Sequence, residues 1–285
     1  MTDPEARKHA YFTQIAPTYS RVTGNTTKDL FNEVLKSHDL SINSDSIIHD
    51  NAAGPGTATE ALISWSRKHN VSSKIVVTDY VPAMVEACEA IRTRHSDDSL
   101  WQSVAIAVAE SSDLGEFDND HFTHSICNFS IFTFTHAAKC LKEILRTLRP
   151  GGTSVVTCWK RFAVSEVIAA AQDHVKGSEW GEAHRMPTNG PEYMQEGYTA
   201  KLVREAEFEE GKIKSFATKT VVKRGEDWAG LHEFLLNPFV KGAATKEWSE
   251  EELGRWPEAV NAALEKEEQA HGGILFEAWV VIAQK

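Results

Sequence analysis

Short apolar runs alternate with longer amphipathic segments through the middle of the chain. The runs are rich in Ile, Val and Ala and lie at 46–49, 74–78, 104–108, 125–128 and 153–159. Successive residues in these runs are apolar, so both faces of each predicted strand are apolar. This pattern is typical of strands whose two faces are covered by helices. Helical segments of ten or more residues separate them, at about 58–69, from Pro82 onward, and at about 135–147. This pattern predicts βαβ units and a parallel sheet.

The two ends of the chain add helices to this core. The first 45 residues are predicted to be helical, with breaks near Pro17 and Gly24. Two late strands are expected at about 213–222 and 276–283, with a helical insert at about 227–271 between them. A long insert at one sheet edge is a candidate lid over a ligand site. The division expected within one compact domain is a cap at 1–45, a core at 46–226 plus 273–285, and a lid at 227–272.

Composition removes several classes of function. The 285 residues carry a net charge of −11, which repels phosphate backbones and argues against nucleic acid and anionic membranes as partners. No apolar run is long enough for a transmembrane helix, and the N-terminus lacks a signal-peptide pattern, so a cytoplasmic protein is expected. Four widely spaced cysteines predict buried free thiols. The twelve histidines show no metal-ligand spacing, so no metal is expected.

The turn after the first strand, Asp50–Thr57, is the most informative stretch. Gly54 and Gly56 follow a buried strand and open a helix, where glycine lets a ligand approach the backbone. The turn has no Gly-Lys-Ser/Thr for a P-loop and no third glycine of a dinucleotide fingerprint. Asp50 lies at the carboxyl end of the strand, where doubly wound sheets bind ligands, and an acid there suits an ammonium better than a pyrophosphate. S-adenosylmethionine, which has an amino group and a sulfonium but no phosphate, fits an acidic site of this kind. The alternative is that Asp50 acts only as a helix N-cap.

Polar residues also follow the next three strands. Asp79 is placed to accept hydrogen bonds from ribose hydroxyls, and Met84 to pack on adenine. Glu110, in the loop from Ala109 to Leu114, is placed to present a polar edge to the adenine amino group. Asn128-Phe129 is a polar and aromatic pair beside the sulfonium position, where cation–π attraction is available. Each has an ordinary structural alternative, as a cap, core, loop or turn residue, but together they mark one edge of one sheet.

Aromatic residues cluster just past the fourth and fifth strands and predict an apolar pocket for a small organic acceptor. They are Phe129, Phe132, Phe134, Trp159 and Phe162. A thiol acceptor ionises with little help, whereas an unactivated hydroxyl needs a base. The candidate bases are His124, His136 and His184. His136, at the start of a helix close to the predicted cofactor edge, is the weak first choice.

These residues resemble the class I S-adenosylmethionine-dependent methyltransferases. The matching blocks are 47–56, 76–84, 109–114, 124–129 and 145–159, the last with a Leu-x-Pro-Gly-Gly turn. The resemblance implies a Rossmann-like, doubly wound, mostly parallel seven-stranded α/β sheet, with S-adenosylmethionine as cofactor and S-adenosylhomocysteine as product. One departure is Ala52, which stands where the family usually has the first of three glycines. The cofactor residues implied are Asp50, Ala52, Gly54, Gly56, Asp79, Tyr80, Met84, Ala109, Glu110, Asn128 and Phe129.

A looser similarity to fungal small-molecule methyltransferases, including thiol methyltransferases of epidithiodiketopiperazines, covers most of the chain. It rests on 19–24, 157–162 and 234–239. It implies that cap and lid close over the cofactor, with Tyr19 and Thr23 near the methionine carboxylate. The expected function is secondary-metabolite methylation on S, O or N, with S slightly favoured, and Phe132, Trp159 and Phe162 binding the acceptor. The alternatives are a non-methylating rearrangement with bound cofactor, or a non-catalytic cofactor-binding partner.

Overall fold

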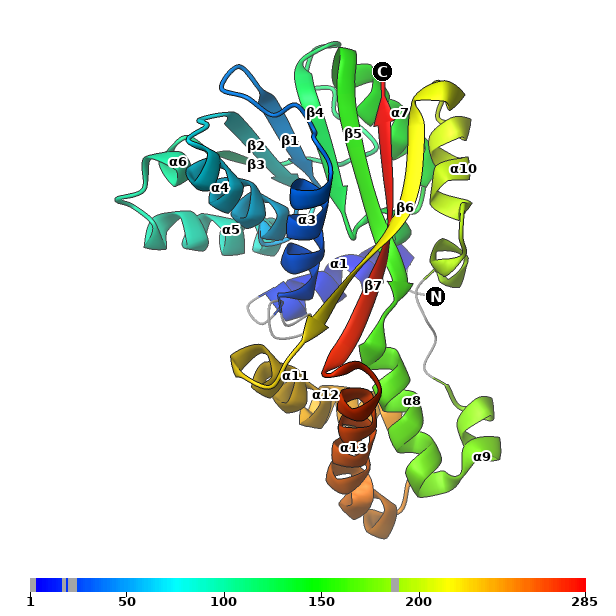
Figure 1. Ribbon diagram of the computed structural model, residues 1–285. Helices are drawn as coiled ribbons and strands as arrows, with labels where there is room; N and C mark the ends of the chain where they lie inside the picture. Colours follow the sequence, from blue (N-terminus) through cyan, green and yellow to red (C-terminus); the bar gives the residue numbers. More distant parts are fainter. Residues whose placement is uncertain (1–3, 17–18, 20–24, 186–189) are drawn as a thin grey trace.

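A seven-stranded sheet forms the centre of the protein in the computed structural model, which describes residues 4–16, 19, 25–185 and 190–285 (Figure 1). The strand order is β3-β2-β1-β4-β5-β7-β6. The strands are β1 Ile47–Asn51, β2 Lys74–Asp79, β3 Ala105–Val108, β4 Phe122–Asn128, β5 Leu148–Arg161, β6 Ile213–Val222 and β7 Ile274–Gln284.

Strand directions divide the sheet into two parts. The pairs β1–β2, β1–β4, β2–β3 and β4–β5 are parallel, whereas β7 runs antiparallel to both β5 and β6. The expected α/β class, the Rossmann-like sheet and its seven strands are therefore confirmed. The carboxyl ends of β1 to β5 all meet at one edge, which is where ligands bind in sheets of this kind.

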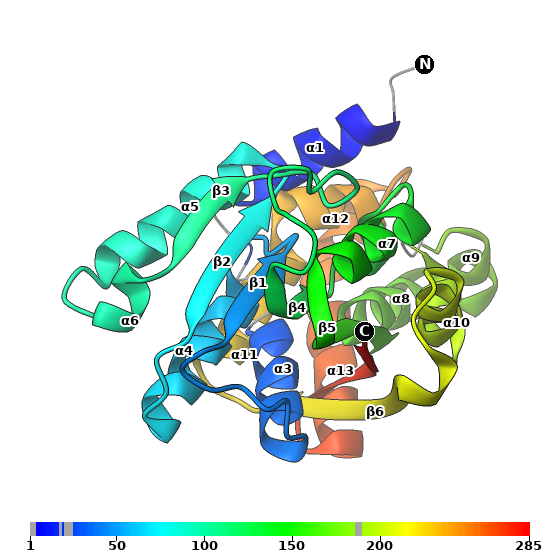
Figure 2. The same ribbon diagram turned by 90° about the horizontal axis from the view of Figure 1, so that it is seen from above.

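Helices cover both faces of the sheet, as Figure 2 shows from above. The helices are α1 Pro4–Ile15, α3 Thr26–Ser37, α4 Thr57–His69, α5 Pro82–Arg94, α6 Ser99–Gln102, α7 Ala137–Thr147, α8 Ala163–Lys176, α9 Ser178–Ala183, α10 Tyr198–Glu205, α11 Glu226–Leu236, α12 Pro238–Ala244 and α13 Glu250–His271. Buried side chains of α3, α4 and α5 form one core cluster with the strands, and those of α7 and α10 form another. Burial on both faces explains why the strands are apolar throughout.

One expectation from the sequence is wrong in detail. Pro150-Gly151-Gly152 predicts a turn between helix and strand, but the structure places this stretch inside β5. Gly151 adopts a left-handed φ of 78° and donates its N–H to the Lys285 carbonyl at 2.9 Å. A register shift in the neighbouring strand between Phe122 and His124 accompanies this irregular section. The strand continues because the end of the chain pairs with it.

A second group of helices lies beyond the carboxyl ends of β4 and β5. Figure 1 shows α8, α9 and α11–α13 gathered below the sheet, with α1 crossing the ends of the strands. The helical insert between the two late strands is present as α11, α12 and α13. The sequence did not predict α8, α9 and α10. The division into cap, core and lid remains a prediction.

Two composition-based expectations concern cysteines and membranes. Cys88, Cys127, Cys140 and Cys158 are all free and buried, as predicted. Burial raises the pKa of the Cys88 and Cys127 thiols to about 12 and that of Cys158 to about 11. Among the helices of the described residues, none is long and apolar enough to span a membrane.

Candidate functional site

The first acid of the expected site, Asp50, is completely buried near the end of β1. Its Oδ2 accepts hydrogen bonds from the backbone N–H and the hydroxyl of Thr59, at 2.9 and 2.6 Å, in the first turn of α4. Its Oδ1 is buried and has no hydrogen-bond partner among the described residues. Burial raises the pKa of Asp50 to about 6, and the charge of nearby Asp79 acts in the same direction. The hydrogen bonds from Thr59 oppose this rise but do not cancel it. Asp50 thus caps the helix with one oxygen and leaves the other available.

The turn that follows has an unusual backbone at three positions. Ala52, Gly54 and Gly56 have positive φ values of 52°, 58° and 91°. A side chain at Gly56 would clash with Cys88 Sγ at 2.8 Å, whereas one at Gly54 would meet only Met84 Sδ at 4.0 Å. Gly56 is therefore required by packing, and Gly54 leaves room beside the turn. Ala52 takes the left-handed conformation that glycine adopts more easily.

The second acid, Asp79, ends β2 and faces this turn. Its Oδ2 accepts the Gly54 N–H at 2.8 Å, and its Oδ1 accepts the Val81 N–H at 2.9 Å. Its side chain is nearly buried, and this burial raises its pKa although the two backbone bonds lower it. Because each carboxylate oxygen has two acceptor positions, Asp79 can still receive bonds from a ligand.

The N-terminal helix packs against this part of the site. Ile15 and Ala16 form a small apolar cluster with Val81 and Met84, and Tyr19 and Tyr80 pack against it. The His9 ring lies edge-on to Tyr80 at 5.8 Å. Burial raises the pKa of the Tyr19 phenol, and Tyr11 and Asp79 act in the same direction. Thr23 lies outside the described residues.

The loop after β3 contacts the end of β1 through residues that the sequence did not single out. Ser111 Oγ donates to Asn51 Oδ1 at 2.8 Å, and both side chains are buried. The Nδ2 of Asn51 has no partner within the described part of the chain. Ala109 is buried and donates its N–H to the Asp79 carbonyl at 3.1 Å, while Glu110 is exposed. The loop therefore lies against both acidic strand ends.

Aromatic residues pack together past β4 and β5, where the acceptor pocket was expected. The Phe129 ring lies 4.2 Å from Trp159, which lies 4.9 Å from Phe162. Phe132 packs against the same cluster, which continues into the helices below the sheet. Phe134 packs instead against the cluster under α7. Four of the five predicted aromatic residues are thus brought together.

The three candidate bases have different surroundings. His124 is buried, and its two ring nitrogens lie 2.8 Å from Thr123 Oγ1 and 2.7 Å from the Leu40 carbonyl. These contacts make it a structural residue, which corrects its place among the candidate bases. His184 stacks on Trp180 and contacts the Trp180 carbonyl, far along the chain from the strand ends. His136 is exposed at the N-cap of α7 without a capping hydrogen bond.

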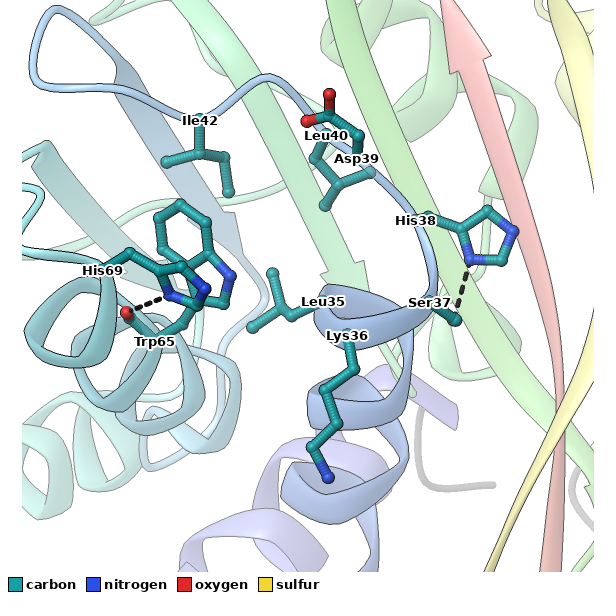
Figure 3. A pocket seen from close by; sticks show the side chains of 9 residues that line it. All are labelled: Leu35, Lys36, Ser37, His38, Asp39, Leu40, Ile42, Trp65 and His69. Atoms are coloured by element: carbon teal, nitrogen blue, oxygen red, sulfur yellow. Dashed lines mark hydrogen bonds between the residues drawn. The ribbon is translucent and has the colours of Figure 1, made fainter.

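A hollow of about 230 Å³ lies elsewhere, between the C-terminal ends of α3 and α4 (Figure 3). Trp65 and His69 stack at 4.3 Å on one side of it, with Leu35, Leu40 and Ile42 nearby. None of the described residues that line it carries a buried side-chain atom lacking a partner. We therefore place the functional site at the strand ends.

Comparison with known proteins identifies the central region. Residues 49–156 match the family model of a methyltransferase domain. The chain is 31% identical over 117 residues to methyltransferase ucsB of an Acremonium species, covering 40% of this chain and 41% of that protein. It is 24% identical over 244 residues to methyltransferase tpcH of Aspergillus fumigatus, covering 81% and 78%. The match thus spans less than half of the length of the Acremonium relative.

Solved structures agree on the fold over most of the chain. The MccD protein covers 90% of this chain and 96% of its own at 13% identity and a TM-score of 0.51. The cyclase SpnF covers 90% and 80% at 17% identity and a TM-score of 0.50. Residues 49–156 thus resemble a methyltransferase domain, and the fold of the chain agrees with that of class I S-adenosylmethionine-dependent methyltransferases. The comparisons agree with the resemblance seen in the sequence and support S-adenosylmethionine as the cofactor.

Proposed function

We propose that the protein transfers the methyl group of S-adenosylmethionine to a small-molecule natural product. The observation that carries the proposal is the pair of buried acids, Asp50 and Asp79, on the adjacent parallel strands of a methyltransferase domain. The unpartnered Oδ1 of Asp50 suits the ammonium group of the donor. Asp79, held by two backbone N–H groups, is placed to accept the ribose hydroxyls.

The donor supplies an electrophilic methyl group on a positively charged sulfur, so the protein must align a nucleophile with it and exclude water. The backbone at Gly54 leaves room for a ligand, and the aromatic cluster of Phe129, Phe132, Trp159 and Phe162 gives an apolar wall. Orientation of two reactants contributes up to about 7–11 kcal/mol to such a reaction. Closure of cap and lid over both reactants belongs to this proposal.

A thiol is the favoured acceptor, with oxygen and nitrogen acceptors as alternatives. Of the three candidate bases, His124 is engaged with the backbone and His136 is exposed. A free thiol has a pKa of about 8.5, so a useful fraction ionises near neutral pH without a base. The fungal origin of both curated relatives supports a role in secondary metabolism.

The test is a donor with an isotope-labelled methyl group, incubated with the protein and panels of thiol, phenol and amine metabolites. We expect a labelled product and S-adenosylhomocysteine in equal amounts by mass spectrometry, with thiols the best substrates. Absence of thermal stabilisation by both S-adenosylmethionine and S-adenosylhomocysteine would refute cofactor binding itself.

A second candidate is a non-methylating reaction with the cofactor held as a structural or electrostatic element. This candidate is included because the chain is similar in fold to the cyclase SpnF. A protein that binds the donor, converts a metabolite and never releases S-adenosylhomocysteine would establish this second function.

A further inference from the structure

Thr157, in β5, hydrogen-bonds to two of the expected site residues although its side chain is almost completely buried. It lies beside Asn128 in the parallel register of β4 and β5. The Thr157 hydroxyl donates to Asn128 Oδ1 at 2.8 Å and accepts the Phe129 N–H at 2.9 Å. The hydroxyl therefore donates to the last residue of β4 and accepts from the residue that follows it.

These bonds set the orientation of the Asn128 amide. The amide oxygen points to the Thr157 hydroxyl, and Nδ2 donates to the Thr27 carbonyl at 3.3 Å. If the amide were reversed, its oxygen would face the Thr27 carbonyl oxygen, and the hydroxyl proton of Thr157 would lose its acceptor. The Thr157 hydroxyl thus fixes the orientation of the Asn128 amide, with its oxygen toward Thr157 and its nitrogen toward Thr27.

The same residue holds the backbone of Phe129 in an uncommon conformation. Phe129 has a φ of 54°, in the left-handed region that bulky residues rarely adopt. Its N–H is shared between the hydroxyl and the carbonyl of Thr157, at 2.9 and 3.2 Å. This conformation places the phenyl ring against Trp159. A strained conformation persists only where surrounding contacts over-determine it.

We propose that Thr157 is a positioning residue for methyl transfer, acting through Asn128 and Phe129 to form the surface that meets the sulfonium. The inference rests on the proposed function and on the expectation from the sequence that Asn128 and Phe129 lie beside the sulfonium. Because its side chain is almost completely buried, Thr157 is expected to act through these two residues and not by contact with the donor. Its hydroxyl keeps the amide and the aromatic ring in the arrangement that distinguishes a charged sulfonium from the uncharged thioether of the product.

The experiment compares Thr157→Val, which keeps the volume but removes the hydroxyl, with Thr157→Ser, which keeps the hydroxyl. Calorimetry measures the affinity of each variant for S-adenosylmethionine and for S-adenosylhomocysteine. We expect Thr157→Val to weaken S-adenosylmethionine binding roughly tenfold, since cation–π contacts act only on the charged sulfur. The affinity of Thr157→Val for S-adenosylhomocysteine is expected to stay within about threefold of wild type. Thr157→Ser is expected to bind both ligands as wild type does.

A matched control is Thr153→Val, a buried threonine on the same strand but four residues further from the carboxyl end. It should leave both affinities unchanged. Equal weakening of both ligands in Thr157→Val, or no weakening of S-adenosylmethionine, overturns the positioning role, because general destabilisation does not separate the two ligands. If the wild type binds neither ligand, the proposed function fails, and the role of Thr157 with it.

Discussion

At the scale of single residues, Asp50 combines a structural task with an expected binding task. One oxygen caps α4 through Thr59, and the other is buried without a partner among the described residues. An isolated buried charge is costly, so the folded protein holds the proton of this carboxyl more tightly than the unfolded chain does. Near neutral pH, this buried charge therefore lowers the stability of the ligand-free protein.

The amount by which the Asp50 charge lowers the free energy of unfolding is expected to depend on pH. The folded pKa of about 6 lies above the usual value of 3.8, so stability contributed by Asp50 falls as pH rises from about 4 to 6 and then stays constant. In Asp50→Asn, the amide oxygen can accept from Thr59 without any charge. We expect this variant to be more stable than wild type at pH 8 by about 3 kcal/mol, and equal to it near pH 4.

Urea unfolding without ligand at several pH values measures the difference. The same variant should bind S-adenosylmethionine at least about tenfold more weakly, since it lacks the charge that faces the ammonium. Greater stability with weaker binding is the expected signature of a site residue. A gap in stability that does not change with pH would contradict the assignment.

Sequence alone could locate these acids but not all of their partners. Asp50, Asp79 and Asn128 were predictable because a buried run ends just before each, and parallel strand ends share one edge. Asn51 and Thr157 lie next to or within predicted strands and have the character of ordinary strand residues. Their contacts, to Ser111 and to Asn128, depend on the register between strands, which no local pattern specifies.

At the scale of elements, α1 is the segment that crosses the site. It packs against Val81 and Met84 at one end, and Lys8 Nζ donates to the Thr133 carbonyl at 2.9 Å past the end of β4. The helix therefore contacts two strand ends on either side of β1. We therefore expect α1 to move when a ligand enters or leaves between those ends.

The contact between α1 and the β4 end can be tested with Lys8→Met, which keeps the length of the side chain and removes the hydrogen bond. We expect S-adenosylhomocysteine to dissociate about fivefold faster, because one such bond contributes on the order of 1 kcal/mol. Stopped-flow displacement measures the rate. Lys36→Met, which removes an exposed ion pair with Glu33 on α3, is the control and should not change it. Unchanged dissociation in Lys8→Met would show that α1 does not retain the ligand.

Elements were predicted best where the hydrophobic period was clear. The limits expected for β6, 213–222, agree with the structure, and those of the parallel strands agree approximately. Helices α8, α9 and α10 were missed because the alternation with strands ends at residue 160. Pro150 and Gly151 indicated a turn, but pairing with the end of the chain keeps them in β5, and tertiary pairing is invisible to local propensity.

At the scale of the whole molecule, segments far apart in the sequence meet at the start of α3. Asn25 Nδ2 donates to Asp227 Oδ1 in α11 at 2.8 Å, across 202 positions of the sequence. Thr27, two residues later, accepts from Asn128 through its carbonyl. The N-terminus of α3 thus contacts both α11, in the expected lid, and the end of β4, where the aromatic wall begins.

We expect Asp227→Ala to loosen the lid without unfolding the core. Loss of the bond to Asn25 should raise hydrogen exchange in α11 about fivefold, equivalent to about 1 kcal/mol, while β1 and β2 keep their protection. Exchange measured by mass spectrometry, with and without S-adenosylhomocysteine, gives the comparison. Asp227→Asn keeps an acceptor oxygen and should behave as wild type. An equal increase across the sheet would instead indicate global destabilisation.

The burial of all four thiols has a consequence for the proposed function, because the proposed methyl donor is a reactive alkylating agent. A thiolate near a sulfonium would be methylated in place of the acceptor, and the protein would inactivate itself. With their pKa values raised by burial, Cys88, Cys127 and Cys158 remain protonated and poorly nucleophilic at neutral pH. Burial thereby keeps these thiols from competing with the acceptor for the methyl group in the proposed reaction.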